Sequence, residues 1–229
     1  MAANTDLLAP TVVHWGPAQL PASVLVSVAV SLLLVVVGGW LGQRLRTAPG
    51  PLQTAVEGLI GAAEGAVQAL VGEQSPRVLP FIATLWVFLL CANLVGLLPG
   101  LESPTRDLSV TTALAIVVFF SVHWFGIRAS GWRAYLRHYL QPSPLLLPFH
   151  LVSELTRTLA LAVRLFGNMM SLQLTALLVL LVAGFLVPVP VLLLHVVEAV
   201  VQAYIFGMLA LVYIAGGMQA QVHAISSGD

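Results

Sequence analysis

Long apolar stretches separated by short polar segments dominate the chain. Five approach or exceed the roughly 20 residues that a helix needs to cross a bilayer, and they fall near residues 21–42, 78–99, 109–127, 146–184 and 189–215. The fourth is too long for a simple span and contains Glu154, Arg157 and Arg164. We therefore expect part of it to be steeply tilted or to lie near the cytoplasmic interface. Pro188 and Pro190 predict a turn before the last stretch.

The segment 51–72 has a different pattern. Apolar side chains recur there at helical spacing, namely at Leu52, Val56, Leu59, Ile60, Ala63, Val67 and Leu70. The opposite stripe is polar or small and consists of Gln53, Glu57, Gly61, Glu64 and Gln68. This pattern predicts an amphipathic helix lying on the membrane surface. A loose surface helix without a functional role is the alternative.

The composition points to the same class of protein. The chain is 59% hydrophobic and only 8% charged, whereas soluble domains carry about 25% charged residues. We therefore expect an all-α polytopic membrane protein, with residues 1–229 forming a single integral-membrane domain in the lipid bilayer. The net charge of zero gives no reason to expect a nucleic-acid partner. Residues 1–20 lack the basic region of a cleaved signal peptide.

The arginines predict the orientation, because cytoplasmic loops of membrane proteins are enriched in them. The segment between the first two stretches is flanked by Arg44, Arg46 and Arg77, and the third stretch is followed by Arg128, Arg133 and Arg137. The loop 100–108 carries Glu102 and Asp107 and only one arginine, Arg106. With the arginine-rich loops inside, five crossings place the N-terminus outside and the C-terminus in the cytoplasm.

Arg164 is the most informative single residue, since it stands inside an apolar stretch. Arginine keeps its proton at any physiological pH. At membrane depth it costs at least a few kcal/mol unless it faces a water-filled cavity or a fixed anion. The chain offers no obvious ionisable partner at that depth, so we expect the carboxylate that Arg164 attracts to come from another subunit.

Other polar side chains accompany Arg164 at membrane depth: Asn168, Gln173, His195, Glu198 and Gln202. The last three are spaced i, i+3 and i+7, so they share one helix face. In an antiparallel hairpin, residues at equal depth have a nearly constant sum of positions. This relation predicts Arg164 opposite Gln202, and Gln173 opposite His195.

These residues suit an ion path. His195 and Glu198 titrate and can pass protons through bound water, whereas Arg164 attracts a carboxylate and blocks a cation. We interpret the set as an ion half-channel that ends at a fixed positive charge. A structural alternative exists for each residue alone, with His195 bonded to Glu198, and Asn168 and Gln173 forming interhelical hydrogen bonds.

Catalytic and cofactor motifs are absent from the sequence. The pair His195 and Glu198 resembles half of a metal site, but no second His or Glu stands one turn away, so we expect no metal. No Gly-rich phosphate loop is present, so we expect this chain to bind no ATP and no cofactor. An intramembrane enzyme is a further alternative, but the sequence lacks the nucleophile and base, or the metal ligands, that it would need. An autonomous secondary transporter is another, and the lack of an internal repeat disfavours it.

Several short motifs occur in order between about residues 78 and 215. They are Asn-Leu-Val-Gly-Leu-Leu-Pro at 93–99, Pro-Thr-Arg-Asp at 104–107, Glu-Leu-Thr-Arg at 154–157, Arg-Leu-Phe-Gly-Asn-Met at 164–169, and Gln-Ala-Tyr-Ile-Phe at 202–206 with Tyr213. Together they resemble subunit a (subunit 6) of F-type ATP synthases, bacterial type. The string that begins at Arg164 resembles the signature of that family.

This resemblance implies a stator subunit of the membrane sector, not catalytic alone, in the bacterial inner membrane. The implied partners within the ATP synthase complex are a ring of c subunits, which the long hairpin over about 146–215 would face, and the b subunits of the peripheral stalk. Two offset half-channels would be separated by Arg164, which displaces the ion from a ring carboxylate. His195 and Gln202 match polar positions of the family, and Glu154, Arg157 and Tyr213 are candidate supporting residues.

The chain departs from the family at Gln173, where relatives often carry Glu or His. Glutamine cannot titrate, so Glu198 is a candidate to replace the missing group from the neighbouring helix. Thr158 and Ala160 also stand where Pro and Ser are common. We predict proton coupling, with a sodium-coupled variant of the same complex as the alternative.

Overall fold

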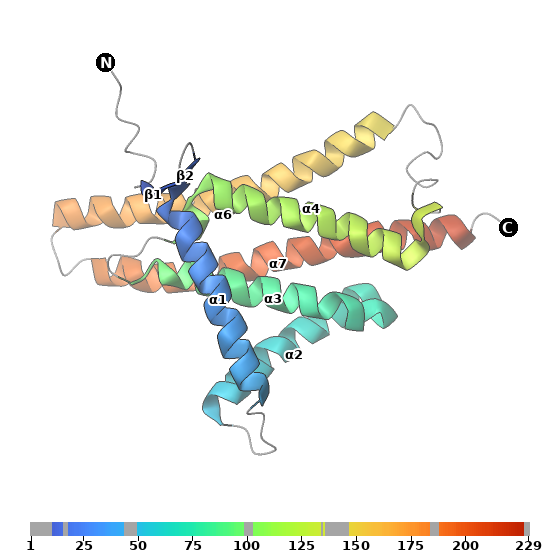
Figure 1. Ribbon diagram of the computed structural model, residues 1–229, viewed down its shortest axis with the longest axis horizontal. Helices are drawn as coiled ribbons and strands as arrows, with labels where there is room; N and C mark the ends of the chain where they lie inside the picture. Colours follow the sequence, from blue (N-terminus) through green and yellow to red (C-terminus); the bar gives the residue numbers. More distant parts are fainter. Residues whose placement is uncertain are drawn as a thin grey trace. The chain divides into compact units, whose positions relative to one another are not determined.

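The computed structural model describes residues 11–15, 18–43, 50–98, 103–133, 135, 147–183 and 188–226. Within these residues helices dominate (Figure 1), and five helical segments are long and apolar enough to cross a membrane by length and composition. The predicted all-helical polytopic class is therefore confirmed. A short antiparallel hairpin, β1 (Thr11–Trp15) and β2 (Ala18–Pro21), precedes the first helix and was not predicted.

The helices begin within three residues of the predicted stretches. They are α1 (Ala22–Gln43), α2 (Pro51–Val71), α3 (Ser75–Val95), α4 (Leu108–Ser130), α6 (Leu147–Ala183) and α7 (Pro188–Ser226), with short 3-10 helices at η1 (Gly72–Gln74) and η2 (Pro104–Arg106). Pro188 and Pro190, predicted to mark the turn before the last span, lie in the first turn of α7, and residues 184–187 before them lie outside the described part. A proline there breaks no hydrogen bond, since the first N–H groups of a helix have no intrahelical acceptor.

The chain divides into two compact units. The first comprises Met1–Gln53, Val87–Thr111 and Arg164–Ala203, and the second comprises Thr54–Trp86, Thr112–Val163 and Tyr204–Asp229. Each unit is described by itself below. The single integral-membrane domain stays a prediction. The side chains of Arg44, Arg46, Glu102, Arg137 and Gln173 lie outside the described part of the chain.

In the first unit, Asp107 connects the start of α1 with the start of α4. Its Oδ1 accepts the backbone N–H of Ser109 at 2.8 Å, which caps the first turn of α4. Its Oδ2 accepts a hydrogen bond from the Ser23 hydroxyl of α1. Burial acts to raise the pKa of Asp107, but these hydrogen bonds and the charge of Arg106 outweigh it and hold the pKa below its usual value.

The remainder of α1 makes few contacts in the described structure. Val30 is one of its few buried side chains. Apolar residues along the rest of the helix are exposed, among them Leu32, Leu33, Val35 and Val36. In a bilayer this surface can face lipid at no cost, and the polar contact of Ser23 with Asp107 attaches the start of α1 to the start of α4 within this unit.

In the second unit, α2 has the predicted two-sided character. Ala63 and Val67 are buried, while Glu57 and Glu64 are exposed. Its location on a membrane surface stays a prediction. Gly207 of α7 packs directly on Trp86 of α3, since a Cβ at position 207 would lie 1.5 Å from Trp86 Nε1. Only glycine permits this approach.

We expect Ser23→Ala and Asp107→Asn each to destabilise the purified membrane sector at neutral pH, by about 1 kcal/mol for a partly exposed hydrogen bond to a charge. The carboxylate stabilises only while it is ionised, because its pKa is lowered by folding. Its contribution is complete above the unfolded pKa and is lost as the pH falls through the folded pKa, below about pH 4. Thermal unfolding of wild type and variants across a pH series measures this.

The matched control is Ser31→Ala, since the Ser31 hydroxyl bonds only the Ser27 carbonyl of its own helix. We expect no pH-dependent change for it. A destabilisation by Asp107→Asn that is equally large well below pH 4 would contradict the assigned role of the carboxylate.

Candidate ion-translocation site

Arg164 lies on α6 with its side chain exposed on the surface of the chain. The neighbouring Leu165 and Met169 are buried, so the helix turns its apolar side inward and the guanidinium outward. Among the described residues, none forms a hydrogen bond or ion pair with Arg164. The positive charge is therefore not neutralised within that part of the chain.

Asn168, one turn beyond Arg164, forms a hydrogen bond with α7. Its Nδ2 donates to Gln202 Oε1 at 2.6 Å, and the Gln202 side chain is 0% exposed. The bonded partner of Gln202 on α6 is therefore Asn168, and the predicted place of Arg164 opposite Gln202 stays a prediction. Two neutral amides can be buried as a pair, whereas a buried guanidinium would need a counter-ion.

Two buried nitrogen atoms on α7 lack partners within the described structure. They are Gln202 Nε2 and Nε2 of His195, whose side chain is 8% exposed. A buried polar atom without a hydrogen bond costs about 1–3 kcal/mol, and bound water commonly satisfies such atoms. His195 and Gln202 are seven residues apart on one face, about 10 Å along the helix axis.

Glu198 lies between these two residues and is partly exposed. It forms no hydrogen bond or ion pair with His195 or with any other described residue. The alternative in which Glu198 is the structural partner of His195 is therefore not supported. Gln173 belongs to α6, but its side chain is outside the described part, so its predicted pairing with His195 stays a prediction.

Asn93 begins a buried hydrogen-bond network that the sequence analysis did not assign to the site. Its Nδ2 donates to the carbonyl of Ala199 on α7 at 3.3 Å, and its Oδ1 accepts the Thr105 hydroxyl at 2.7 Å. The Ser103 hydroxyl contacts that of Thr105 at 2.7 Å and donates to the Ala92 carbonyl at 3.0 Å. Through Ala199, the network thus fixes the turn of α7 that carries Glu198. An asparagine inside an apolar stretch was the available signal.

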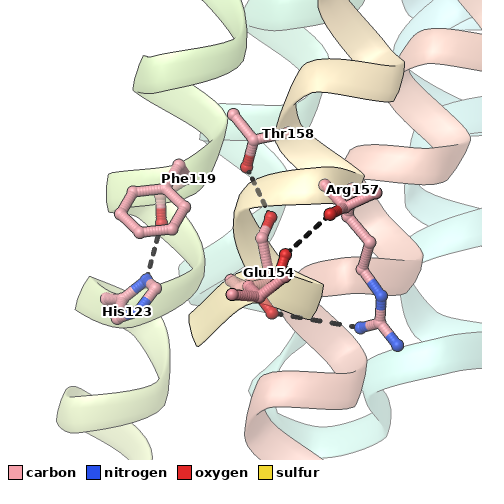
Figure 2. A network of polar contacts seen from close by, with 7 residues as sticks. Phe119, His123, Glu154, Arg157 and Thr158 are labelled. Carbon is pink, nitrogen blue, oxygen red and sulfur yellow. Dashed lines mark hydrogen bonds and ion pairs between the residues drawn. The ribbon is translucent and has the colours of Figure 1, made fainter. Parts of the chain in front are cut away.

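Arg157 of α6, in the second unit, contrasts with Arg164. Its guanidinium lies 5.6 Å from the ring centroid of Tyr213 and its Nη1 lies 4.0 Å from Glu154 Oε2. Figure 2 shows Glu154 and Arg157 on the same turn, with the Thr158 hydroxyl donating to the Glu154 carbonyl at 3.0 Å. Exposed ion pairs are worth about 0–1 kcal/mol, so these contacts orient Arg157 more than they stabilise the fold.

The class of protein follows from this arrangement. It is a polytopic helical membrane protein in which two long helices carry buried amides, a buried imidazole and an unneutralised arginine. Polar groups at membrane depth mark ion pathways. An ion-translocating membrane subunit is the class that fits these features.

Comparison with known proteins identifies the family. A family model described as "ATP synthase A chain" matches residues 23–215. "ATP synthase subunit a 2" of Pelobacter propionicus is 59% identical over 208 residues, covering 90% of this chain and 91% of the relative. "ATP synthase subunit a 1" of Hahella chejuensis is 55% identical over 216 residues (94% and 92%), and "ATP synthase subunit a" of Legionella pneumophila is 63% identical over 172 residues (75% of each).

The chain belongs to the subunit a family of ATP synthases. It is a multi-pass membrane protein and the ion-translocating subunit of the membrane sector. It is not catalytic, because catalysis lies in the F1 part of the complex.

Proposed function

We propose that this subunit forms two ion half-channels beside a rotating ring of c subunits, with Arg164 as the charge that separates them. Through this contact it couples proton translocation to rotation and hence to ATP synthesis or hydrolysis. The observation that carries the proposal is the exposed guanidinium of Arg164, which has no partner within the described residues. A carboxylate of the ring would supply the missing counter-ion as it passes.

Within one half-channel, His195 and Glu198 are the titratable groups and bound water links them. The unpaired nitrogen atoms of His195 and Gln202 support a hydrated path, because water would remove the cost of burying them. Asn168 holds Gln202 in place by its hydrogen bond. Glu198 serves in place of Gln173, which cannot titrate.

The proposed location is a bacterial inner membrane, with the N-terminus outside and the C-terminus in the cytoplasm. The arginine asymmetry supports the orientation, and the bacterial relatives support the location. The outward side of α6 around Arg164 is the proposed contact with the c ring. The b subunits of the peripheral stalk are the other proposed partner.

Arg164→Ala is expected to lower ATP-driven ion pumping at least about 100-fold, because a charge worth a few kcal/mol at membrane depth is removed. Arg164→Lys should fail too, since lysine is a compact charge that loses its proton in a dry site. Pumping into inverted vesicles measures this, with assembly of the complex checked on a native gel. The control is Arg133→Ala, which removes an exposed arginine elsewhere and should pump normally. Coupled pumping by an assembled Arg164→Ala complex would overturn the proposal.

Glu198→Gln should slow passive proton flux about tenfold and change its pH dependence, because an acid–base group contributes at least that much when it relays protons. Gln173→Glu in the same chain should restore part of the flux. Flux through membranes stripped of the soluble sector, across a pH series, tests both. An unchanged pH profile in Glu198→Gln would remove Glu198 from the path. Flux that requires sodium ions would instead favour the sodium-coupled variant.

The orientation is tested by labelling introduced cysteines in a Cys91→Ala background. Ser103 is buried and unsuitable, so we choose Ser109 and Trp132, whose side chains are exposed near the two ends of α4. Ser109→Cys should react with an impermeant maleimide from outside the cell, and Trp132→Cys only in inverted vesicles. Labelling of both from one face would refute the five-span orientation.

A further inference from the structure

The second unit contains a pocket that is lined by none of the residues assigned to ion translocation. It has a volume of about 140 Å³ and is lined by Gln74, Arg77, Phe125, Arg128, Ala129 and Met218. Gln74 ends η1, and the other residues come from the start of α3, the last turns of α4 and the C-terminal part of α7, which lie at the right of Figure 1. The pocket is far larger than the space that one water needs.

The polar lining is positively charged. Arg77 Nη1 donates to Gln74 Oε1 at 3.3 Å, and the Arg128 guanidinium lies 5.7 Å from the Trp124 ring centroid. Neither arginine has a carboxylate partner within the described structure. The sequence itself contains no Asp or Glu between Asp107 and Glu154. The two guanidinium groups therefore keep most of their capacity to bind an anion.

The remainder of the lining is apolar, and its position along α4 indicates the membrane interface. Phe125, Ala129 and Met218 provide carbon atoms beside the two guanidinium groups. Exposed tryptophans lie on either side of Arg128, at Trp124 and Trp132. Tryptophan is enriched at the headgroup level of membranes, and Arg128 stands in the last turn of an apolar helix. The pocket thus combines anion-binding groups and an apolar wall at the depth of lipid headgroups.

We propose that this pocket binds an anionic phospholipid, with the headgroup phosphate between Arg77 and Arg128 and the first part of an acyl chain against Phe125 and Met218. Basic pockets between membrane helices bind such headgroups. A free phosphate ion would use the two charges but not the apolar wall. A carboxylate from a partner subunit would need a chain to enter at the same place, so it becomes one outcome of the test.

The experiment uses the complete ATP synthase reconstituted in phosphatidylcholine vesicles that contain a phosphatidylglycerol probe with a photoreactive acyl chain. After illumination, mass spectrometry maps the attachment sites, and a phosphatidylcholine probe of the same structure serves for comparison. Arg77→Gln/Arg128→Gln removes both pocket charges. Arg133→Gln is the matched control, because it removes an exposed arginine close in sequence that does not line the pocket.

We expect the phosphatidylglycerol probe to label the peptides that contain Phe125 and Met218, and the double variant to weaken this labelling about 30-fold, which corresponds to about 1 kcal/mol for each arginine. Arg133→Gln should label as wild type. Equal labelling by the phosphatidylcholine probe, or no change in the double variant, would overturn the proposal. Displacement by excess inorganic phosphate would show a site for soluble anions, and protection of the pocket by a cross-link to another subunit would show a protein partner. Either result would also overturn it.

Discussion

The cost of placing polar groups in hydrocarbon is the constraint on which the described structure depends. Each such group must be paired, hydrated or turned toward something outside the chain. Asn93, Thr105 and Ser103 follow the first course, since each bonds another group at the ends of α3 and η2. His195 and Gln202 each leave a buried nitrogen for water to satisfy. Arg164 follows the third course and presents its charge on the surface.

The two arginines of α6 differ in whether their charge has a partner within the described part of the chain. Arg157 has Glu154 one turn before it and the ring of Tyr213 beside it. Arg164, seven residues later, has neither within the described part. A charge that is neutralised inside its own subunit has little to offer a moving carboxylate. This difference in partners supports the proposal that the translocation path is organised around Arg164 and not around Arg157.

Much of the fold was predictable because a helix needs about 20 apolar residues to cross a bilayer, so each long apolar stretch locates a helix. The side-chain register was harder to predict. Equal sums of positions predict Gln202 opposite Arg164, and the structure adds that Gln202 bonds Asn168, one turn further along α6. Residues at equal depth can be estimated from their positions, but the side chain that an amide will bond cannot. Ser23 and Asp107 form a hydrogen bond although they are 84 positions apart in the sequence. No local sequence pattern predicts which serine will bind a given carboxylate. The proposed role of Arg164 rests on the permanent charge of an arginine in an apolar stretch, which the sequence shows, whereas the exposure of its side chain required the structure.

The same constraint explains why polar side chains on α7 do not disturb its backbone. The backbone of α7 satisfies its own hydrogen bonds, so only side chains need partners. The Asn93 amide adds a bond to the Ala199 carbonyl, which ties this turn of α7 to α3 on the side away from solvent. Glu198 precedes Ala199 directly and remains without a partner among the described residues. The first unit thus holds the backbone at one position beside an unpaired carboxylate, the group that we propose gains and loses protons. Neutral amides position the helix while this carboxylate has no described partner, and such an arrangement would suit the proposed half-channel.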